Sequence, residues 1–258
     1  MMSKSSIFLT INVIITCSFV LSCLTKKQAE TTQKVDSNIT KKDIVATITS
    51  KPVIPEIEQR MILQGLVDIQ TLDSTIMVEL KYSTTDNFVH TDVYGDLTRA
   101  YMQTKPAQML AKANHFLKEK YPNYRLLVYD AARPLTVQHT FWNLLDSIPP
   151  KKREDFVANP KDGSIHNFGS AVDLTVYDLA KKKPLEMGTS YDFFGDLAYP
   201  RLEAFMLRNK KLTQEQLNNR LILRNAMEKA GYERIESEWW HFNAMARIQA
   251  KALYKIID

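Results

Sequence analysis

At 258 residues, with 45% hydrophobic and 10% aromatic side chains, the chain can bury a core of its own and is not disordered over most of its length. Its formal net charge of +5 comes from 34 Lys and Arg against 29 Asp and Glu, and the two signs are interspersed. Because no basic stripe appears, no nucleic-acid partner is predicted.

The first 23 residues predict export. Lys4 provides a positive start, residues 7–21 form a short apolar run, and Ser22 directly precedes Cys23. This order is typical of a secretory signal, and the small residue before the cysteine resembles a bacterial lipobox. We expect residues 1–23 to be a leader and Cys23 to carry the lipid of an exported, membrane-anchored, periplasm-facing lipoprotein. A plain signal peptide and an uncleaved anchor are the alternatives.

Residues 24–54 are rich in Lys, Thr, Gln and Ser and contain no aromatic residue, which predicts a flexible tether. The folded domain is then expected to span residues 55–258. Cys17 and Cys23 are the only cysteines of the chain, so this domain has neither a disulfide nor a cysteine-ligated metal. Any metal site in it must use histidine and carboxylate.

The spacing of apolar residues predicts the main elements of the domain. Helices are expected over residues 107–120, 134–148, 217–230 (with Gly231 following its end) and 244–257. Strands are expected over residues 124–129, 171–176 (with Asp178 starting a turn), 232–235 and 239–242. Because helices and strands do not alternate strictly, the expected class is α+β, with a largely antiparallel central sheet flanked by helices.

Two short motifs offer the donors of a catalytic zinc site. Residues 164–173 contain His166 and Asp173, and residues 238–241 contain Glu238 and His241. A catalytic zinc takes three protein ligands, and an acid/base that does not occupy the metal completes the site. His166, Asp173 and His241 can be the ligands and Glu238 the proton carrier, which makes a zinc hydrolase the leading hypothesis.

Each of these residues has a structural alternative. Asp173 lies in an apolar strand, where a carboxylate needs a cation or hydrogen bonds, and it could instead cap a turn or pair with an arginine. His166 could be an exposed loop histidine. Residues three apart face opposite sides of a strand, so Glu238 and His241 can share a metal only if the backbone bends or Glu238 lies on the preceding loop. The two tryptophans between them could wall the site or simply pack in the core, and both roles can hold together.

Five segments, in this order along the chain, resemble the zinc D-alanyl-D-alanine dipeptidases, the VanX-like branch of the peptidases that share the Hedgehog/DD-peptidase fold. The segments are 81–88 (KYSTTDNF), 129–134 (YDAARP), 164–175 (SIHNFGSAVDLT), 187–193 (MGTSYDF) and 238–241 (EWWH). The resemblance covers about residues 67–242, which is essentially the whole predicted domain.

The resemblance implies a role for each matching residue. One zinc ion per chain would be held by His166, Asp173 and His241, with Glu238 as general base and acid. Arg133 matches the arginine that stabilises the oxyanion, and its structural alternative is a salt bridge with Asp130. The substrate-pocket positions implied are Asp192, which would hold the ammonium of a dipeptide, Ser164 and Tyr82.

The predicted function is an exported zinc metallopeptidase that hydrolyses D-alanyl-D-alanine or related D-amino-acid dipeptides. Two departures from the family pattern change the surroundings of the pocket: Ala132 replaces an aromatic residue, and residues 166–169 read HNFG instead of HSRG. The alternatives are a peptidoglycan DD-carboxypeptidase or endopeptidase, and a non-catalytic zinc-containing module that binds the cell wall. The sequence leaves the oligomeric state open.

Overall fold

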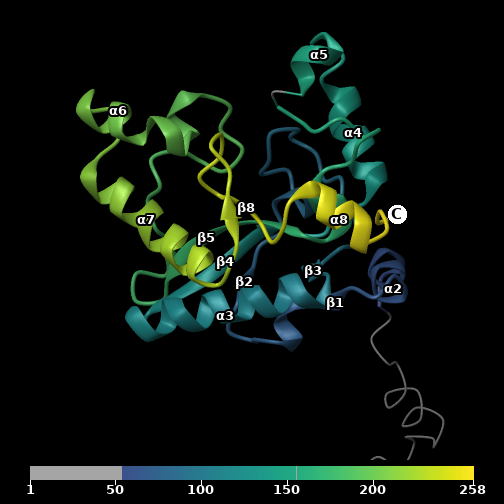
Figure 1. Cartoon of the computed structure of the whole chain (residues 1–258), viewed down its shortest axis with the longest axis horizontal. Coiled ribbons are helices and arrows are strands. Elements are labelled where there is room, and N and C mark those ends of the chain that lie inside the picture. The colour runs from purple at the N-terminus through teal and green to yellow at the C-terminus, as the bar shows by residue number, and fades with distance from the viewer. Residues whose placement is uncertain (1–53, 155) are drawn as a thin grey trace, which may run out of the picture. The chain divides into compact units, whose positions relative to one another are not determined.

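A six-stranded sheet forms the centre of the domain in the computed structural model, which describes residues 54–154 and 156–258 (Figure 1). The strand order is β2 (Met77–Val78), β4 (Tyr124–Asp130), β5 (Ala171–Asp178), β8 (His241–Asn243) and β7 (Glu233–Arg234), and β6 (Lys183–Pro184) also pairs with β5. The pairing of β2 with β4 is parallel and the others are antiparallel. The predicted α+β class with a largely antiparallel sheet is confirmed.

Helices surround this sheet. They are α2 (Glu56–Leu63), α3 (Thr104–Lys120), α4 (Leu135–Leu144), α5 (Pro150–Arg153), α6 (Glu203–Arg208), α7 (Gln214–Lys229) and α8 (Arg247–Leu253). A small second sheet pairs β1 (Val67–Asp68) with β3 (Tyr101–Met102). Figure 1 shows α3 running beneath the strands and α7 meeting it near one end. Among the residues described, no helix is long and apolar enough to cross a membrane.

The central strand β5 divides its side chains between two faces. Val172, Leu174 and Val176 are buried in the same hydrophobic core as Leu110 of α3 and Leu223 of α7. Alternate residues of a strand point to opposite faces, so Asp173 and Thr175 lie on the other face, although both are also buried. This second face carries the polar site.

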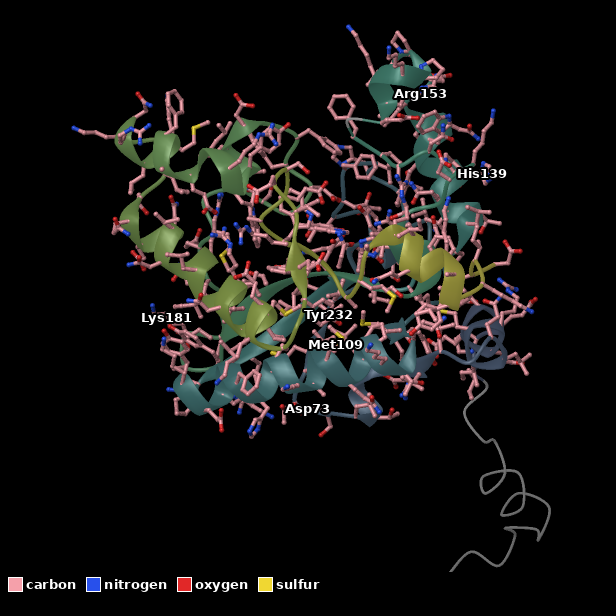
Figure 2. The ribbon with its side chains drawn as sticks, viewed as in Figure 1. Asp73, Met109, His139, Arg153, Lys181 and Tyr232 are labelled. Atoms are coloured by element: carbon pink, nitrogen blue, oxygen red, sulfur yellow. The ribbon has the colours of Figure 1, made fainter. Side chains whose placement is uncertain are left out.

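Tyr232 joins α3 to the end of α7 (Figure 2). Its hydroxyl donates a hydrogen bond to the carbonyl of Pro106 at 2.7 Å, and its ring is buried. Gly231, directly before it, has a φ of 98°, which favours glycine and ends the helix as predicted. The buried ring and its hydrogen bond therefore hold the turn that leads from α7 into β7 against α3.

Two predicted helices begin three residues too late. Helix α3 starts at Thr104 instead of residue 107, because proline is tolerated in the first turn, where its missing N–H has no partner in the helix. Helix α7 starts at Gln214 instead of residue 217, because Thr213 and Gln216 form a reciprocal capping box. The strand predicted over residues 124–129 is confirmed, and β5 continues to Asp178, whose carboxylate accepts the N–H groups of the following turn.

The predicted helix over residues 244–257 is wrong at both ends. The structure has a helix only over Arg247–Leu253. Ala244 N donates to Ser170 O at 2.8 Å, which extends the pairing of β8 with β5. Ile257 N donates to Asn167 O at 2.8 Å, and Leu135 N donates to Ile257 O at 2.8 Å. Because tertiary partners satisfy these backbone groups, the segment is not helical at either end.

The predicted leader over residues 1–23, with Cys23, and the predicted tether over residues 24–54 lie outside the described residues, apart from Ile54. Their roles stay predictions.

Candidate active site

One row of residues across three neighbouring strands builds the polar site. Asp173 of β5 pairs with Asp130 of β4 on one side and with His241 of β8 on the other. The register of β4 shifts between Val128 and Asp130. Without that shift Asp130 would share the core face of Val128, and the irregularity turns it to the face of Asp173.

His166 reaches the same face from the short 3-10 helix η3 (Ile165–Phe168), which directly precedes β5. Ser164 caps this helix: its hydroxyl accepts the N–H of His166 at 3.3 Å, and its own N–H donates to Asn167 Oδ1 at 2.7 Å. Gly169 ends the helix with a φ of 63°, and a Cβ there would lie 3.2 Å from Gln103 N. The turn therefore requires glycine and fixes where His166 stands relative to the strand.

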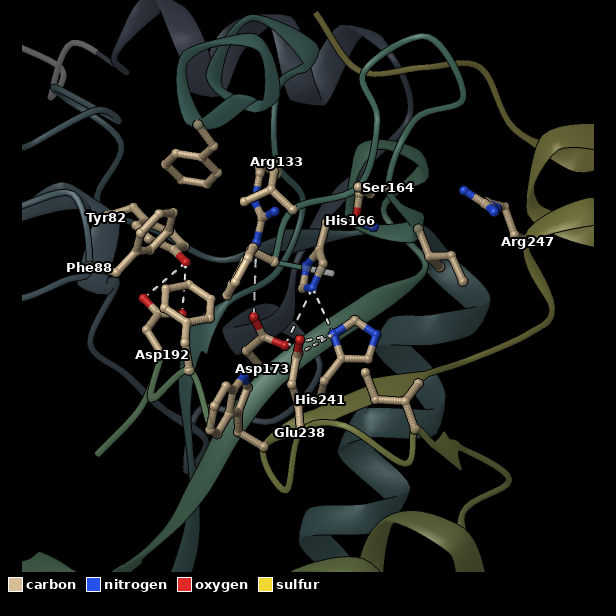
Figure 3. Close-up of a pocket in the computed structure, with 18 residues that line it drawn as sticks. Tyr82, Phe88, Arg133, Ser164, His166, Asp173, Asp192, Glu238, His241 and Arg247 are labelled. Atoms are coloured by element: carbon tan, nitrogen blue, oxygen red, sulfur yellow. Dashed lines mark hydrogen bonds and ion pairs between the residues drawn. The ribbon is translucent and has the colours of Figure 1, made fainter. Parts of the chain in front are cut away.

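The donor atoms of His166, Asp173 and His241 form a compact triangle (Figure 3). His241 Nδ1 lies 2.9 Å from Asp173 Oδ1 and 3.2 Å from His166 Nε2, and His166 Nε2 lies 3.4 Å from Asp173 Oδ1. Tetrahedral zinc with bonds of about 2.0–2.1 Å sets its ligand atoms about 3.3–3.4 Å apart. The triangle has the size of one face of such a site.

The outer nitrogens of both histidines are held by oxygen acceptors. His166 Nδ1 lies 2.7 Å from the carbonyl of Ala131, and His241 Nε2 lies 2.8 Å from Asn243 Oδ1. A neutral ring that donates to these oxygens leaves His166 Nε2 or His241 Nδ1 unprotonated and facing Asp173. This is the tautomer that would bind a metal.

Three atoms with lone pairs converge in a buried place, and they repel one another unless a positive charge lies between them. Burial by itself lowers the pKa of His241, but the hydrogen bond and the negative charge of Asp173 outweigh burial and raise this pKa to about 9. The cluster therefore attracts a proton or a metal cation. Its size, its buried setting and its nitrogen and oxygen donors fit a divalent metal such as zinc.

Glu238 lies on the loop that enters β8, which is one of the two arrangements that allow it to share a centre with His241. Its Oε2 lies 3.9 Å from His241 Nδ1, and within residues 54–154 and 156–258 its side chain makes no hydrogen bond. Burial and the nearby carboxylate of Asp173 raise its pKa from 4.5. A half-buried carboxylate with a raised pKa beside a candidate metal site is suited to accept and return a proton.

The two tryptophans after Glu238 have different roles. Both are buried in the hydrophobic core, and Trp239 Nε1 donates to Thr189 Oγ1 at 2.7 Å. Trp240 also lines the pocket, so for this residue the two expected roles hold together.

Arg133 lines the pocket and also makes the salt bridge that was its structural alternative. Its Nε and Nη2 donate to Asp130 Oδ2 at 3.0 and 2.5 Å, and its Nη1 donates to Gln138 Oε1 at 3.0 Å. These three bonds leave two of the five guanidinium N–H groups without a hydrogen bond among the residues described. Nη2 lies 3.9 Å from Asp173 Oδ2, so the fixed cation faces the His/Asp triangle.

Asp192 closes the pocket on another side. The hydroxyl of Tyr82 lies 3.1 Å from both of its carboxylate oxygens, and the hydroxyl of Tyr191 lies 3.3 Å from that of Tyr82. Tyr191 in turn donates to Asp173 Oδ2 at 2.9 Å. Burial and the negative charge of Asp173 raise the pKa of Asp192 well above 3.8, so this carboxylate gains from a cationic partner.

The loop that carries Asp192 is held at both of its ends by one buried arginine. Arg220 of α7, which is 1% exposed, donates to Met187 O at 2.7 Å and to Leu197 O at 2.9 Å. Its charge is balanced by Glu203, which Arg224 also binds. The loop between these two carbonyls is therefore anchored to a helix of the core.

Every site residue predicted within the domain lines one pocket of about 330 Å³: Tyr82, Arg133, Ser164, His166, Asp173, Asp192, Glu238 and His241. This volume is at the lower end of ligand sites, about 300–1,000 Å³. Sequence reasoning missed the aromatic wall of Phe88, Phe156 and Phe194, the outer partner Asn243, and Arg247. The three phenylalanines lie on separate loops, Asn243 is in β8 and Arg247 begins α8, so no single motif contains them. In the part of the chain that the structure describes, the His/Asp triangle is the one cluster with metal-site geometry.

Residues 63–256 match the family of peptidases described as D-Ala-D-Ala dipeptidase. The D-alanyl-D-alanine dipeptidase of Escherichia coli is 29% identical over 177 residues, which cover 69% of this chain and 83% of that protein. The enzyme of the same name from Enterococcus faecium is 29% identical over 177 residues, covering 64% and 83%.

Among solved structures, the LdcB LD-carboxypeptidase is similar, with a TM-score of 0.37 and 16% identity over 73% of this chain and 72% of that one. The family match extends over most of the described domain. The chain therefore belongs to the D-Ala-D-Ala dipeptidase family and is a peptidase.

Proposed function

We propose that this chain is a zinc peptidase that hydrolyses D-alanyl-D-alanine or closely related D-amino-acid dipeptides. The observation that carries the proposal is the pocket itself. In about 330 Å³ it combines a donor triangle of metal-site size, a proton carrier beside it and a carboxylate that favours a cation. The relatives named D-alanyl-D-alanine dipeptidase support the choice of substrate.

His166, Asp173 and His241 would hold the zinc, which supplies a Lewis acid that polarises the scissile carbonyl and acidifies a water molecule. Glu238 takes a proton from the attacking water and delivers it to the leaving amine as the C–N bond breaks. Arg133, held in place by Asp130, offers its free N–H groups to the carbonyl oxygen as negative charge develops there. Asp192, with Tyr82, binds the ammonium of the dipeptide.

The test is cleavage by the purified full-length chain in detergent, followed as released D-alanine. We expect it to cleave D-Ala-D-Ala, to lose this activity when a chelator removes the metal, and to regain it when zinc is added back. A pentapeptide stem should be cleaved far more slowly, because the α-nitrogen of its penultimate D-alanine is part of a peptide bond and is not a free ammonium. Faster cleavage of the pentapeptide would assign the chain to the carboxypeptidases, and cleavage of neither substrate would favour the binding module.

We also propose that the peptidase works outside the cytoplasm, anchored through a lipid on Cys23. The support is the order of positive start, apolar run and small residue before the cysteine in residues 1–23. Labelled palmitate is expected to mark the full-length chain in growing bacteria and not its Cys23→Ser variant. Equal labelling of both chains would contradict the anchor.

A further inference from the structure

Arg133 is tied to η3 through its backbone, in addition to the bonds that its side chain makes with Asp130. Its N–H donates to His166 O at 3.1 Å, and its carbonyl accepts Asn167 Nδ2 at 2.8 Å. Both polar groups of the arginine backbone are therefore bonded to two successive residues of η3. The first bond joins two backbones and depends on no side chain, whereas the second exists only because residue 167 is asparagine.

Asn167 is 0% exposed, and both polar atoms of its side chain have backbone partners. Its Oδ1 accepts the N–H of Ser164 at 2.7 Å, while its Nδ2 donates to the carbonyl of Arg133. Its own main-chain carbonyl accepts the N–H of Ile257 at 2.8 Å, which attaches the C-terminal segment to η3. One buried residue thus connects the cap of η3, the arginine and the end of the chain.

Position 167 is also one of the two at which this chain reads HNFG in place of HSRG. A serine there would offer one hydroxyl oxygen on a shorter side chain, where asparagine has a separate donor atom and acceptor atom. The pair of bonds to Ser164 and Arg133 needs both of these atoms. The link between η3 and Arg133 is therefore specific to the sequence of this chain.

The place of Arg133 relative to the His/Asp triangle decides what its free N–H groups can reach. Nη2 lies 3.9 Å from Asp173 Oδ2 (Figure 3). Hydrogen bonds to two side chains hold the guanidinium, but the base of the side chain moves with its backbone. Because η3 carries His166, the bond from Asn167 fastens that backbone to the element that positions a corner of the triangle.

We propose that Asn167 is a positioning residue that holds Arg133 against the His/Asp triangle, where the arginine stabilises the oxyanion. The inference rests on the proposed function, in which Arg133 meets the negative charge that develops on the carbonyl oxygen. Loss of the Nδ2 bond would leave a buried carbonyl without its donor, and the backbone would shift to regain one. Misplacement of a catalytic group by about 1 Å can lower a rate about 100-fold, so the effect should fall on kcat.

The experiment is a double-mutant cycle on the full-length chain, with Asn167→Ala and Arg133→Lys. Asn167→Ala should lower kcat for D-Ala-D-Ala at saturating zinc by about 10- to 100-fold and leave KM within about 2-fold. Lysine at position 133 keeps a positive charge beside Asp130 but lacks the rigid fork of the guanidinium. If Asn167 acts through Arg133, its replacement in the Arg133→Lys background should cost only a small part of that loss.

Asn114→Ala is the matched control. Asn114 is also 0% exposed, and its Oδ1 accepts the N–H of Leu126 at 3.0 Å, but it does not line the pocket. Its replacement likewise leaves buried backbone without a partner, so it should lower stability and leave kcat within about 2-fold. Equal losses of kcat in the two alanine variants would make the effect one of stability alone and would overturn the inference.

Amide hydrogen exchange in the metal-free chain gives a readout that does not depend on turnover. The segment that contains Arg133 should exchange faster in Asn167→Ala than in the unsubstituted chain or in Asn114→Ala. Additive losses in the double variant, unchanged exchange of this segment, or a loss confined to zinc affinity would each overturn the role of Asn167. Should Asn167→Ala fail to fold, Asn167→Ser, which keeps one polar atom at this position, takes its place in the cycle.

Failure of the unsubstituted chain to cleave D-Ala-D-Ala would instead refute the proposed function, and full activity of Arg133→Lys would refute the role of Arg133 in it. The exchange measurement would still decide whether Asn167 holds Arg133 in place. The failure of the inference and the failure of the proposed function are therefore distinguishable.

Discussion

Glu238→Gln is expected to lower kcat for D-Ala-D-Ala by about 10²–10⁴-fold, the usual contribution of a positioned general acid/base, while the protein still binds one zinc. Glutamine keeps the shape of the side chain but can neither accept the proton of the attacking water nor deliver one to the leaving amine. The carboxylate stands 3.9 Å from His241 Nδ1 and outside the donor triangle, so zinc binding should persist. Turnover and metal content measured on the same preparation check both halves of the prediction.

Glu236→Gln provides the matched control for this variant. Glu236 lies on the same loop, but it is exposed, pairs with Arg234 at 3.3 Å and does not line the pocket. Its replacement should leave kcat within a factor of two or so, as is usual for surface substitutions. Substantial turnover in Glu238→Gln, or a similar loss in Glu236→Gln, would contradict the assignment of Glu238 as the proton carrier.

Asp173→Asn is expected to abolish stoichiometric zinc binding, and with it activity. The substitution leaves two neutral histidines and an amide where a metal needs the negative charge of the carboxylate. The loss should exceed the roughly 10–100-fold weakening typical of changes to groups that only orient a ligand. Elemental analysis gives the metal content, and thermal unfolding with added zinc gives an independent readout, because a metal that binds the native state raises its stability.

Asn243→Ala is the comparison for Asp173→Asn. It removes only the oxygen that holds His241 Nε2 at 2.8 Å and leaves all three donors in place. Zinc affinity should therefore fall by about 10–100-fold, with activity recovered at high zinc. If Asp173→Asn still bound one zinc with the affinity of the unsubstituted chain, the donor triangle would not be the metal site.

Local patterns were enough for most of the secondary structure. The helices around residues 107–120 and 217–230 and the strand at residues 124–129 follow from apolar spacing, because each buries one face in a common core. The error over residues 244–257 lies where partners distant in sequence replace local ones. Ile257, predicted as the end of a helix, bonds instead to Asn167 and Leu135, and no pattern within residues 244–257 contains that information.

The candidate site divides in the same way. From the sequence alone the candidate residues could be named: two short motifs contain His166, Asp173, Glu238 and His241, and the resemblance to a family added Arg133 and Asp192. Only the tertiary structure decided how they meet. The register that sets Asp173 between Asp130 and His241, and the irregularity in β4 that turns Asp130 to the site, depend on pairing between strands 43 and 68 residues apart.

Arg247 shows most clearly what only the tertiary structure decided. In the sequence it is one more basic residue in a predicted helix, with no acid or histidine at a telling distance. Its place at the pocket arises because Met245 and Ala250 pack on Phe168, some 80 residues away along the chain. The burial of apolar side chains is not directional, and which side chains meet is settled only when the whole core packs. The position of Arg247 at the pocket therefore follows from core packing and not from a local motif.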